Sequence, residues 1–569
     1  MKKLFASKYW WVPVLIVLVG INYLASQAHF RIDLTQEKRY TLSAPTKKML
    51  RELGDQVTVT VLLDGEMPAG FKRLANSARE LLQEFKETGK ANVQFRFQRP
   101  GVDPADSTSA FSMDSLMRMG LKPTNVRVKA KEGEGEEQRY LFPGALVSYH
   151  DRVIPVDFLQ STKATDGDPF STLNNAEALL EFKLAHAIQK ITAETVPAVG
   201  YLLGNGEPLT YNVYDLVERT LKLNYGFGFV PIDSVNVIPQ EFNALVIMKP
   251  TIRFTEAQKL KLDQYIMHGG KVIWLIDKLD ASLDSLMRKK SDFVAFDFGL
   301  NLDDLLFRYG VRINPDLVQD LQCDRLPLVV GNMGDKPQME LQSWPYFPLL
   351  ASYSGHPIAK NMDLVLSMFP NSIDTVKATG VHKTVLLASS ANSRSLSTPA
   401  IVSLNSLKTE EDVKTFNKVN IPVAVLLEGK FSSLFTNRLS QASMDTLAGL
   451  YKQPFRAAPV QDNKMIVIAD GDIASNIVTQ TQGPLAMGYN QFTNYQYANK
   501  DFILNCIEYL VNPSGILETR AKDYTLRLLD PGKVEAEKTQ WQLINIAVPV
   551  LLVIAFGFVY QALRKRKYQ

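Results

Sequence analysis

The longest unbroken apolar runs of the chain occupy residues 10–28 and 541–563. Each run contains about 20 residues, which is the length that an α-helix needs to cross a hydrocarbon core of roughly 30 Å. Tryptophan and tyrosine residues stand at the borders of both runs, as they do where membrane helices meet the lipid headgroups. The pattern therefore predicts two transmembrane helices.

The region after the first apolar run alternates between strand and helix patterns. Apolar residues alternate with polar ones over 57–63 and 92–98, and an apolar stripe with helical spacing lies between them over 71–88. A strand, a helix and a second strand in this order form a β-α-β unit. Residues 29–165 are therefore expected to form an α/β domain similar to thioredoxin, in which residues 127–163 form one exposed hairpin.

A helical pattern over residues 166–195 links this domain to a second one, which is expected over residues 196–515. In the second region, short and continuously apolar runs alternate with helical patterns. The expected strands are 199–203, 244–248, 271–276, 384–388, 422–427 and 464–469. Because continuous apolar runs are typical of strands buried on both faces, we expect a doubly wound parallel sheet and an α/β fold class.

Residues at the helix ends and near the C-terminus predict the bounds of further elements. Thr255 is the expected N-cap of a helix that stops at Gly269-Gly270. A further helix is expected over residues 214–222. The charged stretch 516–540 is expected to be a stalk that leads into the second membrane helix, and residues 564–569 form a basic tail.

Basic residues flank both apolar runs on their outer sides. Three lysines precede the first run, and residues 564–567 are all Lys or Arg. Because flanking Lys and Arg residues are retained in the cytoplasm, both termini are expected there. Residues 29 to about 540 are then expected in the periplasm of a bacterial inner-membrane protein. The alternative for the first run is a cleaved signal peptide, since Ser26-Gln27-Ala28 has the small-x-small pattern of a cleavage site.

The composition is that of a folded protein with more than one domain, since 46% of the 569 residues are hydrophobic and 21% are charged. Removing the seven cations of the two tails from the net charge of +4 leaves about −3 for the stretch between them. The basic character therefore belongs to the tails. The sequence has no basic patch with interleaved aromatic residues, so nucleic-acid binding is not expected.

The residue types that catalysis needs do not form a recognisable motif. No Gly-x-x-x-x-Gly-Lys-Ser/Thr loop is present to hold the phosphates of ATP. Cys323 and Cys506 have neither the CxxC spacing of a metal or redox site nor the small neighbours of a nucleophile elbow. Two buried free thiols are expected rather than a disulfide, and His186 is expected to be structural. We therefore expect a protein that is not an enzyme and has no metal and no cofactor.

Polar side chains at the ends of the expected strands are the candidates for ligand binding. Asn205 and Glu207 follow the first strand of the second domain, Asp277 follows the third, and Asp470 and Asp472 follow the last. Parallel-sheet domains bind ligands at the carboxyl ends of their strands, where these groups can bind a sugar hydroxyl or a peptide. The alternative is that they only form turns or cap helices. The Asp470-Gly-Asp472 sequence lacks the further acidic residues of a calcium site.

Five long segments carry a family resemblance. They are RIDLTQEKRYTLSAPTKKML (31–50), LEFKLAHAIQKI (180–191), LDQYIMHGGKVIWLID (262–277), VIADGDIASN (467–476) and RLLDPGKVEAEKTQWQLIN (527–545). The chain resembles the GldG family, the gliding-motility-associated auxiliary, substrate-binding-like proteins of ABC transporters in Bacteroidota. One turn departs from the family pattern Gly-His-Gly-Glu, because this chain has Gly204-Asn205-Gly206-Glu207. A role for that histidine therefore does not carry over.

The resemblance implies partners and a function. GldG-like proteins work with a GldF-like permease and a GldA-like ATPase in an ABC complex that is linked to gliding and, by association, to type IX secretion. It also implies a glutamine-amidotransferase-like fold for the second domain. The expected function is a non-enzymatic, membrane-anchored periplasmic auxiliary or binding subunit of such a transporter. The alternative is a free-standing periplasmic module that binds an envelope glycan or peptide.

Overall fold

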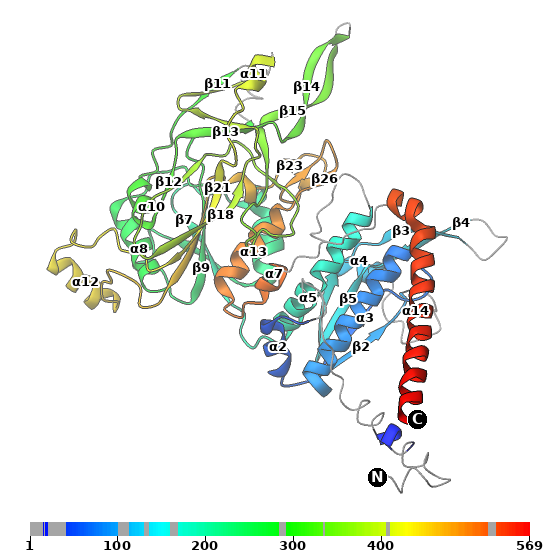
Figure 1. Cartoon of the computed structure of the whole chain (residues 1–569). Helices are drawn as coiled ribbons and strands as arrows, with labels where there is room; N and C mark the ends of the chain where they lie inside the picture. Colours follow the sequence, from blue (N-terminus) through cyan, green and yellow to red (C-terminus); the bar gives the residue numbers. More distant parts are fainter. Residues whose placement is uncertain are drawn as a thin grey trace. The chain divides into compact units, whose positions relative to one another are not determined.

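The computed structural model describes residues 15, 17–20, 41–100, 113–129, 136–159, 169–283, 292–333, 336–404, 410–521 and 531–568. The chain divides into two compact units, Met1–Lys522 and Asp523–Gln569. Their elements are shown in Figure 1. The first expected membrane helix, over residues 10–28, falls outside the described residues except for 15 and 17–20, which are helical.

A small sheet follows the N-terminal segment and has four strands in the order β2-β1-β5-β6. Its strands are β1 (Val57–Val61), β2 (Val93–Phe97), β5 (Gly144–Tyr149) and β6 (Arg152–Asp157). The neighbouring helices are α2 (Ala44–Arg51), α3 (Ala69–Gly89), η1 (Lys90–Asn92) and α4 (Met113–Arg118). β1 and β2 are parallel and are joined through α3, so the expected β-α-β unit is confirmed. Leu74, Leu82 and Phe85 of α3 are buried, as the apolar stripe indicates.

The single hairpin expected over residues 127–163 is wrong. β3 (Thr124–Lys129) pairs with β4 (Glu136–Leu141) in a separate two-stranded sheet, and β5 pairs with β6 in the four-stranded sheet. Pro143 stands between the two hairpins and has no N–H to donate to a ladder. Only two residues separate the end of β4 from the start of β5, so the sequence pattern does not show where one pairing ends and the next begins.

The helix α5 (Pro169–Thr192) packs against β5 and β6 and also contacts the short helix η5 (Ile516–Ala521). Its apolar residues belong to a core that is continuous with one face of the second sheet. His186 Nε2 lies 3.4 Å from Glu508 Oε1 of α13 (Asn499–Val511). The expected linker helix is therefore packed on both sides.

The larger sheet has seven strands in the order β18-β21-β22-β10-β9-β7-β8. Their bounds are β7 (Ala198–Leu203), β8 (Gly226–Pro231), β9 (Phe242–Met248), β10 (Lys271–Leu275), β18 (Val381–Ala388), β21 (Pro422–Gly429) and β22 (Asn463–Ile468). β22, β10, β9, β7 and β8 are parallel to one another. β21 is antiparallel to both of its neighbours. The α/β class with a parallel sheet is confirmed, but the expectation that all strands are parallel is wrong for β21.

Both faces of the larger sheet are covered, which explains its continuously apolar strands. Val246 and Ile273 point into a core that contains the apolar side of α13. Their neighbours Ile247 and Trp274 point into a second core with α8 (Glu256–Met267) and α10 (Asp303–Tyr309). Alternate residues of one strand therefore enter opposite cores.

The helix ends agree with the sequence pattern, whereas one helix interior does not. Thr255 and Gln258 form a capping box at the start of α8, and Gly269 follows its C-cap with a φ of +100°. The helix expected over 214–222 is broken into α6 (Tyr214–Leu216), a π-helical turn (Val217–Leu221) and α7 (Lys222–Asn224), and the short helix η2 (Thr210–Val213) precedes it. The Thr220 hydroxyl donates to the Asp215 carbonyl at 2.7 Å, inside the stretch where the regular α ladder is lost.

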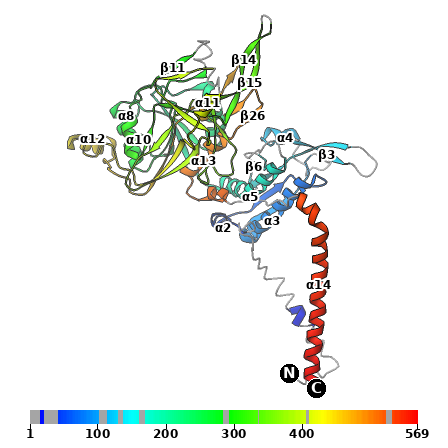
Figure 2. The same cartoon turned by 45° about the horizontal axis from the view of Figure 1, so that its top comes forward.

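The irregular stretch between β10 and β22 forms small sheets around the larger one. Its strands are β11 (Phe293–Ala295), β12 (Val311–Ile313), β13 (Asp316–Asp320), β14 (Cys323–Met333), β15 (Lys336–Leu350), β16 (Val365–Leu366), β17 (Ile373–Thr375), β19 (Ser393–Ser397) and β20 (Ala400–Val402). Its remaining helices are α11 (Glu410–Lys414) and α12 (Gln441–Tyr451). After β22 come η4 (Asp472–Ala474), β23 (Val478–Thr479), β24 (Gly483–Pro484), β25 (Tyr489–Asn490) and β26 (Tyr495–Gln496). The hairpin β14–β15 projects from the body of this unit in both views (Figures 1 and 2).

The second unit consists of one long helix, α14 (Pro531–Tyr568). Among the described residues, its segment 537–566 is the one helical stretch that is long and apolar enough to cross a membrane, and none of its most apolar part is buried within the chain. The expected second membrane helix is thus confirmed as an apolar helix. The part of the expected stalk after residue 530 belongs to the same continuous helix.

Candidate functional site

Three of the predicted acids lie together at the carboxyl ends of the strands. Lys249, which directly follows β9, is 3.1 Å from Asp277 Oδ2 through its Nζ and also forms an ion pair with Asp472. The Gly471 N–H donates to Asp277 Oδ1 at 2.5 Å, and the Asp472 N–H donates to Asp470 Oδ1 at 2.7 Å. We call Lys249, Asp277, Asp470 and Asp472 the Lys249 cluster.

Lys249 is the member of this cluster that sequence reasoning missed. It follows the buried strand 244–248 as Asp277 follows the strand 271–276, so its position in the pattern could have identified it. Its φ of +47° turns the chain immediately after β9. The side chain is 22% exposed, so the one cation of the cluster is mostly removed from solvent.

The Lys249 cluster combines one cation with three carboxylates. Burial raises the pKa of Asp470 well above its ordinary range, and the neighbouring charges of Asp472 and Asp277 raise it further. Burial also raises the pKa of Asp277, against the attraction of Lys249. For Lys249 the attraction of Asp277 and Asp472 outweighs burial and raises its pKa. The cluster therefore places three acidic groups around a single cation.

Asp470 also fixes the irregular region to the sheet. Its Oδ2 accepts a hydrogen bond from the Met368 N–H at 2.8 Å and another from the Ser367 hydroxyl. The Asn371 N–H donates to the Ala469 carbonyl at 2.8 Å. Both carboxylate oxygens of Asp470 therefore accept hydrogen bonds from within the chain.

Asn205 and Glu207 form a separate, buried turn after β7. Glu207 Oε2 accepts hydrogen bonds from the N–H groups of Gly204 at 3.0 Å and Asn205 at 2.7 Å. The Asn205 amide donates to Gln258 Oε1 of the α8 capping box at 3.1 Å. Burial raises the pKa of Glu207 against these backbone donors. The two residues thus close the turn against α8, and the structure does not bring them into contact with the Lys249 cluster.

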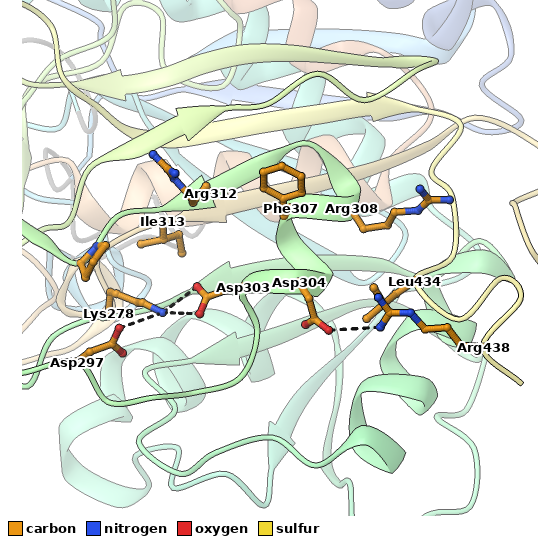
Figure 3. Close-up of a pocket in the computed structure, with 11 residues that line it drawn as sticks. Lys278, Asp297, Asp303, Asp304, Phe307, Arg308, Arg312, Ile313, Leu434 and Arg438 are labelled. Carbon is orange, nitrogen blue, oxygen red and sulfur yellow. Dashed lines mark hydrogen bonds and ion pairs between the residues drawn. The ribbon is translucent and has the colours of Figure 1, made fainter.

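A hollow of about 560 Å³ opens next to the carboxyl end of β10. Its walls come from Lys278, α10, β12 and the segment 434–438 after β21. The charged residues that line it are Lys278, Asp297, Asp303, Asp304, Arg308, Arg312 and Arg438 (Figure 3). None of these residues was a candidate in the sequence, because α10 lies in the irregular stretch, where no regular pattern marks a strand end.

The Lys and Arg side chains that line the hollow differ in how closely they pair with acidic side chains. Lys278 Nζ lies 2.8 Å from both carboxylate oxygens of Asp303 and 3.3 Å from Asp297. Arg312 pairs with Asp374 at 2.6 Å on the surface. Among the described residues, Arg308 has no acidic partner.

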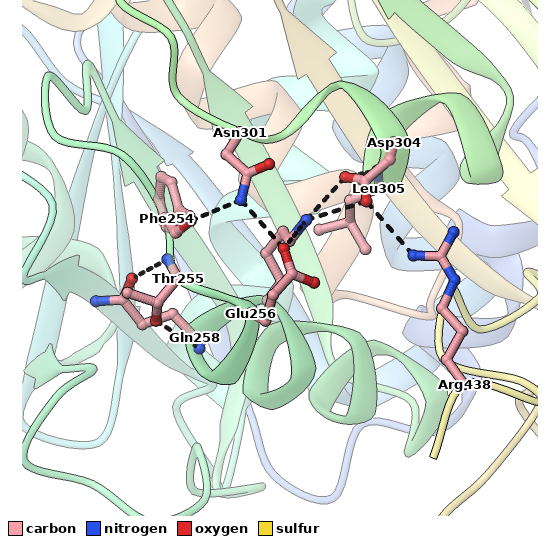
Figure 4. A network of polar contacts seen from close by, with 9 residues as sticks. Phe254, Thr255, Glu256, Gln258, Asn301, Asp304, Leu305 and Arg438 are labelled. Carbon is pink, nitrogen blue, oxygen red and sulfur yellow. Dashed lines mark hydrogen bonds and ion pairs between the residues drawn. The ribbon is translucent and has the colours of Figure 1, made fainter.

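Asp304 lies between two cations of different burial. Its two oxygens each lie 3.0 Å from Nζ of the buried Lys259, whereas Arg438 Nη1 is 3.6 Å away (Figure 4). Lys259 is also 2.7 Å from Glu256 Oε1, which accepts a hydrogen bond from the Asn301 amide at 3.2 Å. Lys259 is shared between Asp304 and Glu256, and the longer contact of Arg438 with Asp304 leaves this exposed arginine only weakly paired.

One buried acid holds both walls of the hollow. Asp263 Oδ1 on α8 accepts hydrogen bonds from the Tyr309 hydroxyl at 2.9 Å and the Leu434 N–H at 3.0 Å. Its Oδ2 accepts one from the Ser433 hydroxyl at 2.6 Å. Burial raises the pKa of Asp263, and these three donors together with the Gln264 amide, which donates to Oδ2 at 3.0 Å, oppose that rise. Asp263 therefore positions α10 and the segment 433–438 relative to α8.

The two cysteines lack the properties of catalytic thiols. Both are free, Cys506 being buried and Cys323 partly so. Burial raises the pKa of Cys323 to about 12 and that of Cys506 well above its ordinary range, so the thiolate form is scarce at neutral pH. Within the described parts of the chain, no group of three or more His, Cys, Asp or Glu residues is arranged to hold a metal ion.

Two parts of the chain match families of known proteins. Residues 196–506 match the family described as "ABC-type uncharacterized transport system", and residues 36–148 match a domain of unknown function. An uncharacterized protein of Borreliella burgdorferi is 21% identical over 436 residues, which cover 74% of this chain and 77% of that protein. The structure titled "mmIFT52 N-terminal domain" aligns with 55% of this chain and 97% of its own at 14% identity, with a TM-score of 0.30.

Proposed function

The chain belongs to the family of ABC-type uncharacterized transport systems, and from this premise we propose that it is a non-enzymatic, membrane-anchored auxiliary subunit whose large unit lies in the periplasm. The observation that carries the proposal is the family match over residues 196–506 together with the apolar helix at 537–566. The basic residues 564–567 at the C-terminal end of that helix support a cytoplasmic C-terminus.

The sequence supports a role in which partner subunits supply the energy for transport. The chain has no P-loop, so an ATPase subunit must supply the energy for any transport. Residues 31–50 and 527–545, among others, resemble the GldG family. We therefore propose a GldF-like permease and a GldA-like ATPase as partners, and a link to gliding motility and type IX secretion in a Bacteroidota envelope.

Two features favour a binding role over catalysis. The raised pKa values of Cys323 and Cys506 oppose a thiol nucleophile. The acids of the Lys249 cluster already bind Lys249 and backbone N–H groups of the chain. The hollow beside α10 is a depression of this unit that is open to a ligand. The hollow is also compatible with a second candidate function, that of a free-standing periplasmic module that binds an envelope glycan or peptide.

Contact between α14 and a permease can be tested by site-specific photo-crosslinking in the native membrane. Ala547 and Ala555 are small residues on one side of α14, the kind of surface on which membrane helices approach closely. A benzophenone amino acid at position 555 should link the chain to a multi-span membrane protein. The matched control is position 553, about 160° away around the helix and at a similar depth, which should link much less.

The outcome separates the two candidate functions. A position-dependent adduct with a permease of an ABC transporter supports the auxiliary subunit. Adducts with no membrane protein at either position, from cells in which other ABC complexes stay assembled, reject it in favour of the free-standing binding module.

A further inference from the structure

The hollow beside α10 is the first of three that share walls. Phe307 and Arg312 line both the first hollow and a second one of about 490 Å³. Ile373, Asp374 and Pro422 line both the second and a third one of about 410 Å³. The three hollows adjoin in series through these shared residues, and we call them together the Phe307 groove. Such an elongated shape suits an extended chain better than a compact small molecule.

One end of the Phe307 groove carries an excess of positive charge. Figure 3 shows Arg308 and Arg438 at the same end of the view, and Lys278 with its two acids at the other. Arg308 has no acidic partner among the described residues, and Arg438 shares its acid with the buried Lys259. Because exposed guanidinium groups bind carboxylates in bidentate geometry, this end is complementary to an acidic side chain.

The middle of the groove is apolar. Phe307 is 53% exposed and stands where the first two hollows meet. Val376, Val385 and Pro422 continue the apolar surface along the second hollow. An exposed aromatic ring beside aliphatic walls favours burial of an apolar side chain of a ligand. The exposed pair Arg312–Asp374 crosses this region and is worth little in water, so a ligand can displace it at small cost.

A polypeptide suits this surface better than a glycan. Sugar hydroxyls need hydrogen-bond partners when they are buried, but the polar groups of the third hollow already bond to one another. The Ser372 hydroxyl donates to Asp316 at 2.7 Å and accepts from the Asn314 amide at 3.0 Å. Lys418 Nζ donates to the Ser395 hydroxyl at 2.5 Å. These contacts leave few free partners for a sugar.

The groove walls are also held in place without a ligand. Asp263 fixes α10 through Tyr309 and fixes the segment 433–438 through Ser433 and Leu434. A preformed site loses little conformational entropy on binding. We propose that the Phe307 groove binds an extended peptide segment of a partner protein in which an acidic side chain lies two residues from an apolar one, so that Arg308 and Arg438 bind the carboxylate and Phe307 contacts the apolar side chain.

The spacing follows from the geometry of an extended chain, in which residues i and i+2 face the same side. The inference rests on the proposed function, because both assign a binding role to the large unit. The test of the inference uses the chain alone. The probe is a fluorescein-labelled peptide with the sequence Glu-Ser-Leu-Ser repeated three times. Its binding to the full-length protein in detergent micelles is measured by fluorescence polarisation, at low and at high salt.

The wild-type protein is expected to bind this peptide, and Arg308→Glu and Arg438→Glu are each expected to weaken binding at least tenfold. Phe307→Ser should weaken it about fivefold, since it removes the apolar contact. The matched control is Arg51→Glu, an exposed arginine on α2, which should bind as the wild type does. The milder Arg308→Gln, with an unchanged melting temperature, separates a lost contact from a folding defect.

Three results would overturn the inference. The first is equal binding by the wild type and both charge-reversed variants. The second is equal binding of a Lys-Ser-Leu-Ser peptide. The third is binding of labelled polygalacturonate without binding of the Glu peptide, which would assign the groove to an acidic glycan. Cross-linking of α14 to a permease is measured separately in membranes, so peptide binding and the proposed transporter role can fail independently.

Discussion

At the scale of single residues, Lys249 is the group on which the carboxyl edge of the sheet depends. It is the one cation next to Asp277 and Asp472, and Asp470 lies beside them with a raised pKa. Removing one partner of a mostly buried ion pair leaves uncompensated charge, which costs more than the pair itself contributes. The stability of this edge should therefore respond to Lys249 far more than to surface lysines.

Lys249→Met should lower the free energy of unfolding by about 3 kcal/mol at pH 7. The loss should be roughly half as large at pH 4.5, because protonation of the carboxylates then relieves their repulsion. The pKa values of Asp277 and Asp470 are raised from an ordinary value of 3.8. The stability that these acids contribute is present below that value and is lost as the pH rises through their raised pKa values. In the Lys249→Met variant, stability should fall more steeply with rising pH than it does in the wild type.

The measurement is urea denaturation of the full-length protein in micelles at both pH values. Lys222→Met is the matched control, since Lys222 forms an exposed i,i+4 pair with Glu218 and should cost under about 0.5 kcal/mol at either pH. An equal loss for Lys249→Met at pH 7 and pH 4.5 would contradict the electrostatic account of the Lys249 cluster.

The candidate residues show what a single sequence can predict at this scale. A polar residue directly after a buried strand must lie at the edge of the sheet, and Asp277, Asp470 and Asp472 do so and meet. The sequence does not show how deeply each side chain is buried or which cation lies opposite. Asn205 and Glu207 follow the same rule, yet they fold back onto their own turn and onto Gln258.

At the scale of elements, Asp263 joins three parts that are distant in the sequence. It connects α8 to α10 and to the segment after β21. Asp263→Ala should leave three buried donors without a partner and cost about 3 kcal/mol or more. Amide hydrogen exchange should accelerate in residues 303–309 and 433–438 before it does in the four-stranded sheet.

Tyr309→Phe is the graded comparison for Asp263→Ala. It removes one donor to a charged acceptor and keeps the ring, so it should cost about 1–2 kcal/mol and accelerate exchange mainly in α10. Uniformly faster exchange across the whole unit in both variants would mean that Asp263 supports global stability and does not position the groove walls.

The capping box of α8 gives a second prediction for an element. Thr255 accepts a hydrogen bond from the Gln258 N–H at 3.2 Å, and the Gln258 side chain accepts one from the Thr255 N–H at 2.8 Å. Thr255→Ala should destabilise the protein by about 1 kcal/mol, while Thr255→Ser should have almost no effect. Thermal melting of both variants measures the difference, and equal melting temperatures for Ala and Ser would show that the cap contributes nothing.

Elements with a strong local signal were predictable, whereas their pairing was not. Helix α3, the ends of α8 and the strands of the larger sheet follow from apolar periodicity and capping residues. The direction of β21 depends on how the chain returns between β18 and β22, and an apolar run has no direction. The break in the helix over 214–222 depends on the local contact of Thr220 with Asp215.

At the scale of the whole molecule, the apolar helix at 537–566 and the cations over 564–567 at its C-terminal end are the basis of the proposed topology. An alkaline phosphatase fusion at residue 569 should be inactive, and a green fluorescent protein fusion there should fluoresce, because the tail is expected in the cytoplasm. Replacing the four cations over 564–567 with Ser should weaken this orientation. Active phosphatase at residue 569 of the unaltered chain would contradict the proposed topology.

The fold class could be predicted from the sequence for a physical reason, whereas the Phe307 groove could not be predicted. Strands that are buried on both faces must be apolar throughout, so the alternation of such runs with helices predicts an α/β sheet. The Phe307 groove combines residues 307, 376 and 434 from separate segments of the irregular region. No local pattern brings these residues together, since their proximity arises only from tertiary packing.

The most direct test of the central claim is gentle solubilisation of the tagged protein from its native membrane, followed by identification and quantification of the proteins that copurify with it. We expect an ABC ATPase and a multi-span permease in a fixed ratio to the chain across several mild detergents and through size-exclusion chromatography. Recovery of the chain alone, under conditions that keep other ABC complexes intact, would contradict its role as a transporter subunit.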